Sequence, residues 1–294
     1  MLYVNHGRKT AWVCGLSVKS YVEVEEAVQS KVEELQSWDI GAGGRICLHL
    51  PDSFTLLEWV IACWRMKISL LVLGQKDDAL RMGSKLQRFR PQLCVESNIP
   101  LHLSSTYAFR EKIDYRVKRI GDYDDASVVA DEMKDFNALY EFSDTFGEEP
   151  RIRTARSIWD EWHGQMRSVR NQVGPSSRVL CMAPIHRSFG LISAALYTMH
   201  RGGTLYFTSY YRKEEWLELL ILNQITHMYA LSSQYKWFKA AIELASPYLK
   251  HRLQLLAEHT PLGADIDSFY LQHTGHPIVS PYDEVEEALS QPIS

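Results

Sequence analysis

The stretch VLCMAPIHRSFGLISAALYTMHRGGTLYF, residues 179–207, determines the fold class. It opens with Val179–Met182, an apolar run with the length of a buried strand, and Pro184 ends this strand because it has no N–H to donate. Ser188 is the predicted cap of a helix in which apolar residues recur at helical spacing as far as Met199. The stretch therefore predicts a strand followed by a helix with one buried face.

A second strand follows this helix directly. Gly202 and Gly203 end the helix, and Thr204–Phe207 is apolar again. A strand, a crossover helix and a second strand form a parallel pair, and parallel sheets are covered by helices. Ligands bind outside the carboxyl ends of such strands, so residues 185–187 lie at a candidate site.

The composition is that of a folded protein without the features of a nucleic-acid or membrane partner. The 294 residues are 46% hydrophobic and 23% charged, with a net charge of −4 and no basic run. We therefore expect no nucleic acid and no membrane among its partners. No export signal or membrane span is visible, because the best apolar run, Phe54–Leu73, contains Glu58, Arg65 and Lys67.

The cysteines and the acidic residues indicate no metal site. The five cysteines form no C-x-x-C motif and are interpreted as core thiols in a reducing compartment, the cytoplasm. They are Cys14, Cys47, Cys63, Cys94 and Cys181. The acidic segment 97–136 is interpreted as solvated surface, since its acids lack the fixed spacing of a metal site.

Hydrophobic periodicity predicts alternating helices and strands. Helices are expected at Tyr21–Trp38, Phe54–Met66, Asp77–Phe89, Ala155–Val173, 188–200, Lys213–Leu222, Asp265–Gln272 and Asp283–Leu289. Strands are expected at Arg45–Leu50, Ser69–Leu73, Leu93–Val95, Leu139–Phe142, Arg178–Met182, Thr204–Phe207, Thr226–Ala230, Leu253–Ala257 and Pro277–Val279.

These elements repeat. Arg45 and Pro51 match Arg178 and Pro184 at an offset of 133 residues, and the later elements follow at offsets of 134 to 136. The repeat predicts two similar layered α/β subdomains, each with a mainly parallel sheet flanked by helices. We expect the first subdomain to span 1–137 and the second to span 138–294.

Three strings resemble the large N-terminal domain of the AMP-forming acyl- and aryl-CoA synthetases, the adenylate-forming ligases that include the adenylation domains of peptide synthetases. They are GAGGRICLHLPDSFTLLEWVIACWRMKISLLVLG (41–74), PIHRSFGLISAALYTMHRGGTLYF (184–207) and VSPYDEVEEA (279–288). The resemblance runs from about Tyr21 to the C-terminus and implies the fold of that domain.

The resemblance is weaker where the family binds the phosphates of ATP. The family's loop reads S-G-T-T-G-x-P-K-G, and the corresponding stretch here is FSDTFGEEPR, residues 142–151. The residues that keep their places are Ser143, Thr145, Gly147, Pro150 and Arg151. The first glycine is replaced by Asp144, and two glutamates precede the proline. A carboxylate about 4 Å from a phosphate charge costs on the order of 4 kcal/mol at an effective dielectric of 20, so this loop opposes triphosphate binding.

Two further nucleotide motifs are altered. The adenine loop G-G-A-P-L is replaced by EHTPL, residues 258–262, in which two glycines have become large polar residues. In the Y-G-x-T-E segment, Tyr282 and Glu286 keep their places, whereas Asp283 and Val285 replace the glycine and the threonine. The resemblance therefore implies a vestigial nucleotide site formed by Ser143, Thr145, Gly147, Arg151, Tyr282 and Glu286.

A possible substrate pocket lies after the first quoted strand. The family commonly has P-L-F-H-S-F-G, and Phe189 and Gly190 match it, while Arg187 stands in place of the histidine with His186 beside it. Arg187 either holds a carboxylate bidentately or pairs with a surface acid. His186 is either a loop histidine or a base.

The resemblance further implies that a hinge and a C-terminal domain with the catalytic lysine would follow Ser294, and we expect this lysine domain to be absent. Three functions remain open. The first is a catalytically inactive relative, without catalytic residues or cofactors, that serves as a binding or scaffold module in acyl activation. The second is one half of a split ligase, the only case that requires ATP and Mg²⁺. The third is a carboxylate or acyl binder that does not use ATP.

We also expect a homo-oligomer or a protein partner, bound through the second half of the chain. Aromatic residues, which are enriched in interface cores, cluster there. They are Tyr206, Phe207, Tyr210, Tyr211, Tyr229, Tyr235, Trp237 and Phe238.

Overall fold

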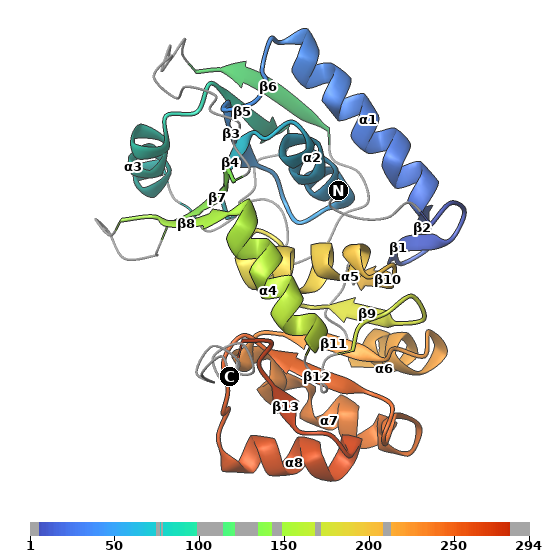
Figure 1. Ribbon diagram of the computed structural model, residues 1–294. Helices are drawn as coiled ribbons and strands as arrows, with labels where there is room; N and C mark the ends of the chain where they lie inside the picture. Colours follow the sequence, from blue (N-terminus) through green and yellow to red (C-terminus); the bar gives the residue numbers. More distant parts are fainter. Residues whose placement is uncertain are drawn as a thin grey trace, which may run out of the picture. The chain divides into compact units, whose positions relative to one another are not determined.

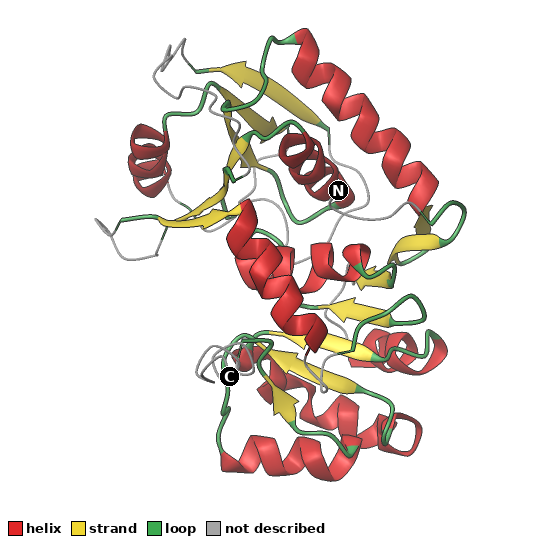
Figure 2. Cartoon of the chain, in the orientation of Figure 1, coloured by secondary structure: helices red, strands yellow, loops and turns green. Residues whose placement is uncertain are grey.

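The computed structural model describes residues 6–74, 77, 79–98, 114–120, 135–142, 149–167, 172–207 and 213–282, with the backbone alone for 213–217. Two compact units make up the chain. The first unit is built on Val22–Ile158, and the second on Tyr3–Tyr21 together with Trp159–Ser294. Each unit holds one mainly parallel sheet flanked by helices, so the predicted fold class is confirmed (Figures 1 and 2).

The sheet of the first unit has six strands in the order β6-β5-β3-β4-β7-β8. The central strands run parallel, and β6 and β8 are antiparallel edges. The strands are β3 (Arg45–His49), β4 (Ser69–Val72), β5 (Leu93–Ser97), β6 (Tyr115–Arg119), β7 (Asn137–Glu141) and β8 (Arg151–Thr154). The helices are α1 (Tyr21–Ser37), α2 (Phe54–Arg65) and α3 (Ala79–Phe89).

Helix α2 is the buried helix of this unit. The Ser53 side chain accepts a 3.1 Å hydrogen bond from the Leu56 N–H and so caps the start of the helix. Every residue from Phe54 to Trp64 is buried, because α2 is apolar on all sides.

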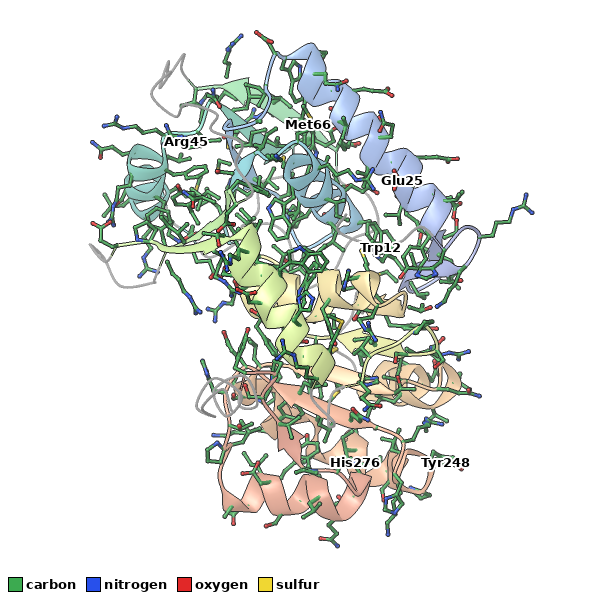
Figure 3. All side chains as sticks on the ribbon, in the orientation of Figure 1. Trp12, Glu25, Arg45, Met66, Tyr248 and His276 are labelled. Carbon is green, nitrogen blue, oxygen red and sulfur yellow. The ribbon has the colours of Figure 1, made fainter. Side chains whose placement is uncertain are left out.

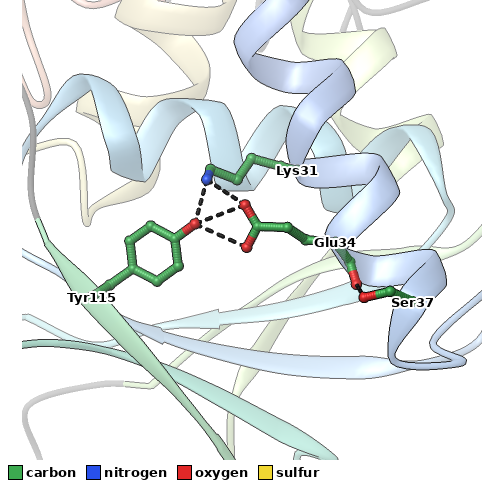
Figure 4. Close-up of polar contacts among 4 residues, drawn as sticks. All are labelled: Lys31, Glu34, Ser37 and Tyr115. Carbon is green, nitrogen blue, oxygen red and sulfur yellow. Dashed lines mark hydrogen bonds and ion pairs between the residues drawn. The ribbon is translucent and has the colours of Figure 1, made fainter.

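A cluster of polar and aromatic side chains attaches the edge strand β6 to α1 (Figure 4). The Tyr115 hydroxyl donates to both carboxylate oxygens of Glu34, at 2.8 and 2.9 Å, and Lys31 contacts both groups. The Lys31 ammonium also lies 5.3 Å from the centre of the Trp59 ring of α2. Burial and the bond to Glu34 raise the pKa of Tyr115, so its hydroxyl stays protonated as the donor.

The sheet of the second unit has seven strands in the order β13-β12-β11-β9-β10-β1-β2, all parallel to their neighbours except β2. The strands are β1 (Thr10–Cys14), β2 (Ser17–Ser20), β9 (Arg178–Cys181), β10 (Thr204–Phe207), β11 (His227–Ala230), β12 (Gln254–Ala257) and β13 (Ile278–Val279). The helices are α4 (Ala155–Arg167), the π-helix η2 (Phe189–Leu196), α5 (Tyr197–His200), α6 (Lys213–Leu222), α7 (Ser232–Leu249) and α8 (Ala264–Thr274).

Two helical layers cover this sheet. The connection from β9 to β10 runs one way along the sheet, and the connections to β11, β12 and β13 run the other way. Right-handed crossovers therefore place η2 and α5 on one face and α6, α7 and α8 on the opposite face. Leu180, Met228 and Leu255 of the strands share one core with Phe238 of α7 and Tyr270 of α8.

The strand positions confirm the internal repeat. In the first sheet β3 lies between β4 and β5, and in the second sheet β9 lies between β10 and β11. Arg45 is the register partner of Ser69, as Arg178 is of Thr204. The predicted strands Arg45–Leu50 and Arg178–Met182 therefore occupy equivalent sheet positions.

The predicted boundary between 137 and 138 does not match the two units, because the repeats exchange their opening hairpins. The hairpin β1–β2, which precedes α1, pairs with β10 in the second sheet, whereas β7–β8, which precedes α4, pairs with β4 in the first sheet. The strand predicted at Leu139–Phe142 exists as β7, but it completes the first sheet and does not open the second.

Several local predictions differ from the structure. Ser188 has helical dihedral angles (φ −48°, ψ −46°) and makes no capping hydrogen bond, because η2 continues the preceding turn. Helix α7 and the strands β1, β2, β6 and β8 were not predicted. The helix predicted at Asp283–Leu289 lies outside the described residues.

The five cysteines are free and buried, as predicted for core thiols. In the part of the chain that the structure describes, no helix has the length and the apolar character needed to cross a membrane.

The buried histidine of β11 predicts a pH-dependent stability. His227 is 4% exposed, its Nδ1 lies 2.8 Å from the Thr226 hydroxyl, and burial lowers its pKa to about 4. The unfolded chain, with a histidine pKa near 6.5, binds the proton more readily. The contribution to stability is therefore complete above pH 6.5 and is lost as the pH falls toward 4, by about 2 kcal/mol between pH 7 and pH 5.

We expect His227→Gln to flatten the dependence of the unfolding free energy on pH over this range, measured by urea denaturation. The control is His163→Gln, at an exposed position of α4, which should keep the slope of the unmodified chain. Equal slopes for the two variants would contradict the assignment.

Candidate functional site

The candidate site lies at the carboxyl ends of the parallel strands of the second unit. There, β9, β12 and β13 lead into residues 182–188, 258–263 and 280–282, which we call the carboxyl-end segments. Because these strands run parallel within one sheet, with β11 between β9 and β12, their following loops lie at the same edge of the sheet.

The first carboxyl-end segment is a tight turn that leads from β9 into η2. Arg187 donates its N–H to the Pro184 carbonyl at 3.2 Å, and Leu191 donates to the Arg187 carbonyl at 2.8 Å. Gly190 packs directly on this turn, since a Cβ there would collide with the Pro184 carbonyl oxygen. Within the turn, His186 is half-buried and Arg187 is exposed.

A chain of hydrogen bonds runs inward from the last segment. The Ser193 hydroxyl, on the buried π-helix, donates to Glu161 Oε1 at 2.6 Å and lies 2.9 Å from the Tyr282 hydroxyl. Glu161, on α4, is 7% exposed and also accepts from Gln165 Nε2 at 3.2 Å. A carboxylate only accepts, so Ser193 gives its one proton to Glu161 and Tyr282 donates to Ser193. We call Gln165, Glu161, Ser193 and Tyr282 the inward relay.

Aromatic rings surround the outer end of the relay. The Phe189 ring centre lies 5.8 Å from that of Tyr229 and 6.4 Å from that of Tyr282. These separations are typical of aromatic pairs. The three rings form an aromatic wall at the carboxyl ends of β9, β11 and β13.

Backbone-directed bonds fix the segments relative to one another. The Ser280 hydroxyl donates to the Glu258 carbonyl at 3.3 Å and accepts from the Tyr282 N–H at 3.2 Å. At the start of α7, Gln234 donates to the Met182 carbonyl at 3.0 Å, and Ser232 donates to the His259 carbonyl at 3.1 Å. The ends of β9, β12 and β13 are thus held in a single arrangement.

The predicted site residues fall into three groups. Phe189 and Tyr282 are in contact, and Gly190, His186 and Arg187 lie on the adjoining turn. Arg151 belongs to the first unit, where it is exposed at the start of β8 opposite Glu141. The remaining four, Ser143, Thr145, Gly147 and Glu286, lie outside the described residues.

In the first unit, Arg88 of α3 contacts both flanks of the loop that resembles the phosphate loop. Its guanidinium is 2.8 Å from Glu149 and lies over the Phe142 ring, 5.5 Å from its centre. One acid of this loop is therefore already paired with a cation of the same unit.

Sequence reasoning missed Glu161, Ser193 and Gln234. Glu161 follows Ile158 by three positions and precedes Gln165 by four, so a helical projection places it on the buried face of α4. The position of Glu161 on the apolar face of α4 could have indicated a polar site, because a buried carboxylate requires hydrogen-bond or charged partners.

The comparisons with known proteins concern the fold. No protein-family model and no curated protein sequence matches the chain. Among solved structures, apo MatB from Rhodopseudomonas palustris matches with a TM-score of 0.74 at 16% identity, over 95% of this chain and 58% of MatB. The inhibitor-bound N-terminal domain of FACL13 from Mycobacterium tuberculosis matches with a TM-score of 0.72 at 13% identity, over 93% of this chain and 71% of that domain.

O-succinylbenzoate coenzyme A synthetase (MenE) from Bacillus subtilis, in complex with AMP, matches with a TM-score of 0.68 at 12% identity, over 92% of this chain and 69% of that protein. The chain thus spans little more than half the length of MatB. At these identities the likeness establishes the fold, while ligand and reaction depend on the residues of this chain.

The inward relay predicts a large effect of one hydroxyl. We expect Ser193→Ala to lower the unfolding free energy by about 1–3 kcal/mol, because the buried Glu161 loses a donor. The control is Thr198→Val, which removes a buried hydroxyl that has no hydrogen-bond partner among the described residues and should leave stability unchanged or raise it. Chemical denaturation measures both, and equal losses would show that Ser193 does not support Glu161.

Proposed function

We propose that this chain, which has the fold of the N-terminal domain of the AMP-forming acyl- and aryl-CoA synthetases, does not form acyl adenylates by itself and acts as a binding or scaffold module. The observation that carries the proposal is the inward relay, which commits the Tyr282 hydroxyl to a buried carboxylate. In the family this tyrosine belongs to the nucleotide site.

The relay determines whether the Tyr282 hydroxyl can donate a hydrogen bond to a nucleotide. Its proton points to Ser193, so the hydroxyl presents lone pairs outward, and lone pairs repel the oxygens of a phosphate. Behind it, Glu161 adds a negative charge that little solvent screens. Both effects oppose an anion at the outer end of the relay.

The surrounding sequence strengthens this opposition. Glu258 replaces a glycine in the stretch that resembles the adenine loop, and its backbone is tied to Ser280 next to Tyr282. Asp144, Glu148 and Glu149 stand in the stretch that resembles the phosphate loop. Arg88 already pairs with Glu149, which leaves Asp144 and Glu148 of this stretch, and each close pair of like charges costs about 4 kcal/mol at an effective dielectric of 20.

A second function, the binding of a small carboxylic acid or acyl thioester without ATP, is supported by the aromatic wall. The half-buried Tyr282 ring is in contact with Phe189, which is itself fully buried against Tyr229, and the exposed Arg187 brings a cation in the turn that leads to Phe189. Such a site suits an apolar acyl group with one polar end. The split-ligase alternative requires ATP and Mg²⁺ to bind, so nucleotide binding separates it from both proposals.

The proposal includes a cytoplasmic location. Its support is the set of five buried free thiols, which is typical of proteins from reducing compartments.

We expect no ATP–pyrophosphate exchange above background with any carboxylic acid, and no rise in melting temperature with Mg·ATP. A ligand that binds only the folded state raises stability in proportion to the logarithm of its concentration over Kd, so a site that opposes ATP gives no shift. Isotope exchange assays and thermal-shift measurements check both statements, with an active acyl-CoA synthetase as the positive control. Exchange activity in a preparation free of host ligases would disprove the proposal.

We further expect at least one small carboxylic acid in a broad panel to raise the melting temperature. Arg187→Gln should reduce this shift if the acid group meets the guanidinium, whereas Arg156→Gln, at an exposed position of α4, should not. Identical shifts in the two variants would exclude Arg187 from the site.

A further inference from the structure

Helix α7 has two apolar faces. One face packs against the sheet and is formed by Gln234, Tyr235, Phe238, Ala241, Ile242, Ala245 and Leu249. The other carries Trp237, Leu244 and Tyr248, which are 65%, 69% and 61% exposed, together with the exposed Ala240 and Pro247. We call these five residues the α7 stripe. Three large exposed apolar side chains along one helix face exceed what a solvated helix normally carries.

The α7 stripe faces away from the core of its unit. Helix α7 packs between α6 and α8, and the bonds to α8 leave from its far side: Tyr270 donates to the Tyr235 carbonyl, and Lys239 lies over the Phe269 ring. At the other flank, Arg252 donates to the Leu220 carbonyl of α6 at 3.2 Å, which holds the C-terminal ends of α6 and α7 together.

Leu222, at the end of α6, is a further large apolar side chain that is 73% exposed. Figure 3 labels Tyr248 at the C-terminal end of α7.

We infer that the α7 stripe binds the same stripe of a second copy of this chain, with the two helices antiparallel about a two-fold axis at Ala240. In such a pair, residues equally far before and after the axis face each other. Ala240 lies opposite its own copy, where a small side chain permits close approach. Trp237, three residues before the axis, then lies within one residue (about 1.5 Å of helix rise) of the level of Leu244 of the second copy, where the two side chains pack, and each interface contains this contact twice.

Charge complementarity supports the same axis. Lys236 and Glu243 lie on the polar border of the stripe, and the antiparallel pairing brings Lys236 within one residue, about 1.5 Å of helix rise, of the level of Glu243 of the second copy. Both are exposed, and neither has an ion-pair partner within the described part of the chain. Two lysine–glutamate pairs therefore flank the apolar contact, and an interface that is complementary to itself in shape and charge favours a second copy over an unrelated partner.

The apolar area of the α7 stripe is comparable with the area that a specific protein–protein interface buries. A specific interface buries at least about 1,000 Å² in total, or about 500 Å² from each copy. Two aromatic side chains, each able to bury about 150–250 Å², supply most of this area, and Ala240, Leu244 and Pro247 of the stripe add to it. The inference does not depend on the proposed function, since the stripe lies on a helix face and the proposed function concerns the ends of the strands.

The first test measures the mass of the purified chain by sedimentation equilibrium from 1 to 200 µM. We expect a dimer of the 33.9 kDa chain. Leu244→Glu should raise the dissociation constant at least tenfold. The matched control is Leu80→Glu, at a leucine of α3 that is 73% exposed, which should leave it unchanged. Circular dichroism confirms that both variants fold. A monomer at 200 µM, or equal dissociation constants for the two variants, would overturn the inference.

The second test addresses the geometry of the pair. Lys236→Glu and Glu243→Lys each place like charges opposite each other and should weaken the dimer severalfold at low salt. The double variant restores both pairs and should recover the original dissociation constant within about twofold. Failure of the double variant to recover would exclude the antiparallel pairing at Ala240.

Discussion

Parallel pairing between strands of different repeats is the constraint on which the rest of the structure depends. Without β7 and β1, the strands β4 and β10 would each present an open edge, and such edges promote aggregation. The exchanged hairpins close both edges. Tyr21 secures one of them, because its buried hydroxyl donates to the Gly203 carbonyl at 2.7 Å across 182 residues of sequence. Neither repeat therefore completes a sheet from its own residues.

The energetic cost of this exchange is small. Each doubling of a closed loop costs only about 0.6 kcal/mol of chain entropy, whereas burial of a large apolar side chain stabilises by about 1.5–3 kcal/mol. Trp12 and Tyr21, both fully buried in the second unit, outweigh the longer closure. The repeat in the sequence predicts which elements recur, but it contains no information about the sheet that each hairpin joins. For this reason the strand positions were predicted correctly and the boundary was not.

Local sequence features also explain why some helices could be predicted and others could not. Helix α2 was predicted because Ser53 marks its start and its apolar run has a clear end. Helix α7 was not, because apolar residues on its core face and on its outer stripe alternate, so they follow no single helical period in the sequence. The apolar outer face that made α7 difficult to recognise in the sequence is thus the face on which Trp237 and Leu244 are exposed. At the site, Phe189 and Tyr282 carry motif residues, whereas Glu161 meets Ser193 only through tertiary packing.

The inward relay and the aromatic wall together set a limit on ligand charge. The turn before η2 contributes one guanidinium, that of Arg187, and the half-buried Tyr282 ring lies against the buried Phe189. A triphosphate brings several charges toward Tyr282, whose proton already points to Ser193 and whose near neighbour in the relay is a buried carboxylate. At close range each surplus pair of like charges costs on the order of 4 kcal/mol, more than a neutral hydrogen bond of about 1 kcal/mol returns. The proposed function therefore favours ligands with at most one negative charge; small carboxylic acids and uncharged acyl groups meet this limit, whereas nucleotides, CoA esters included, do not.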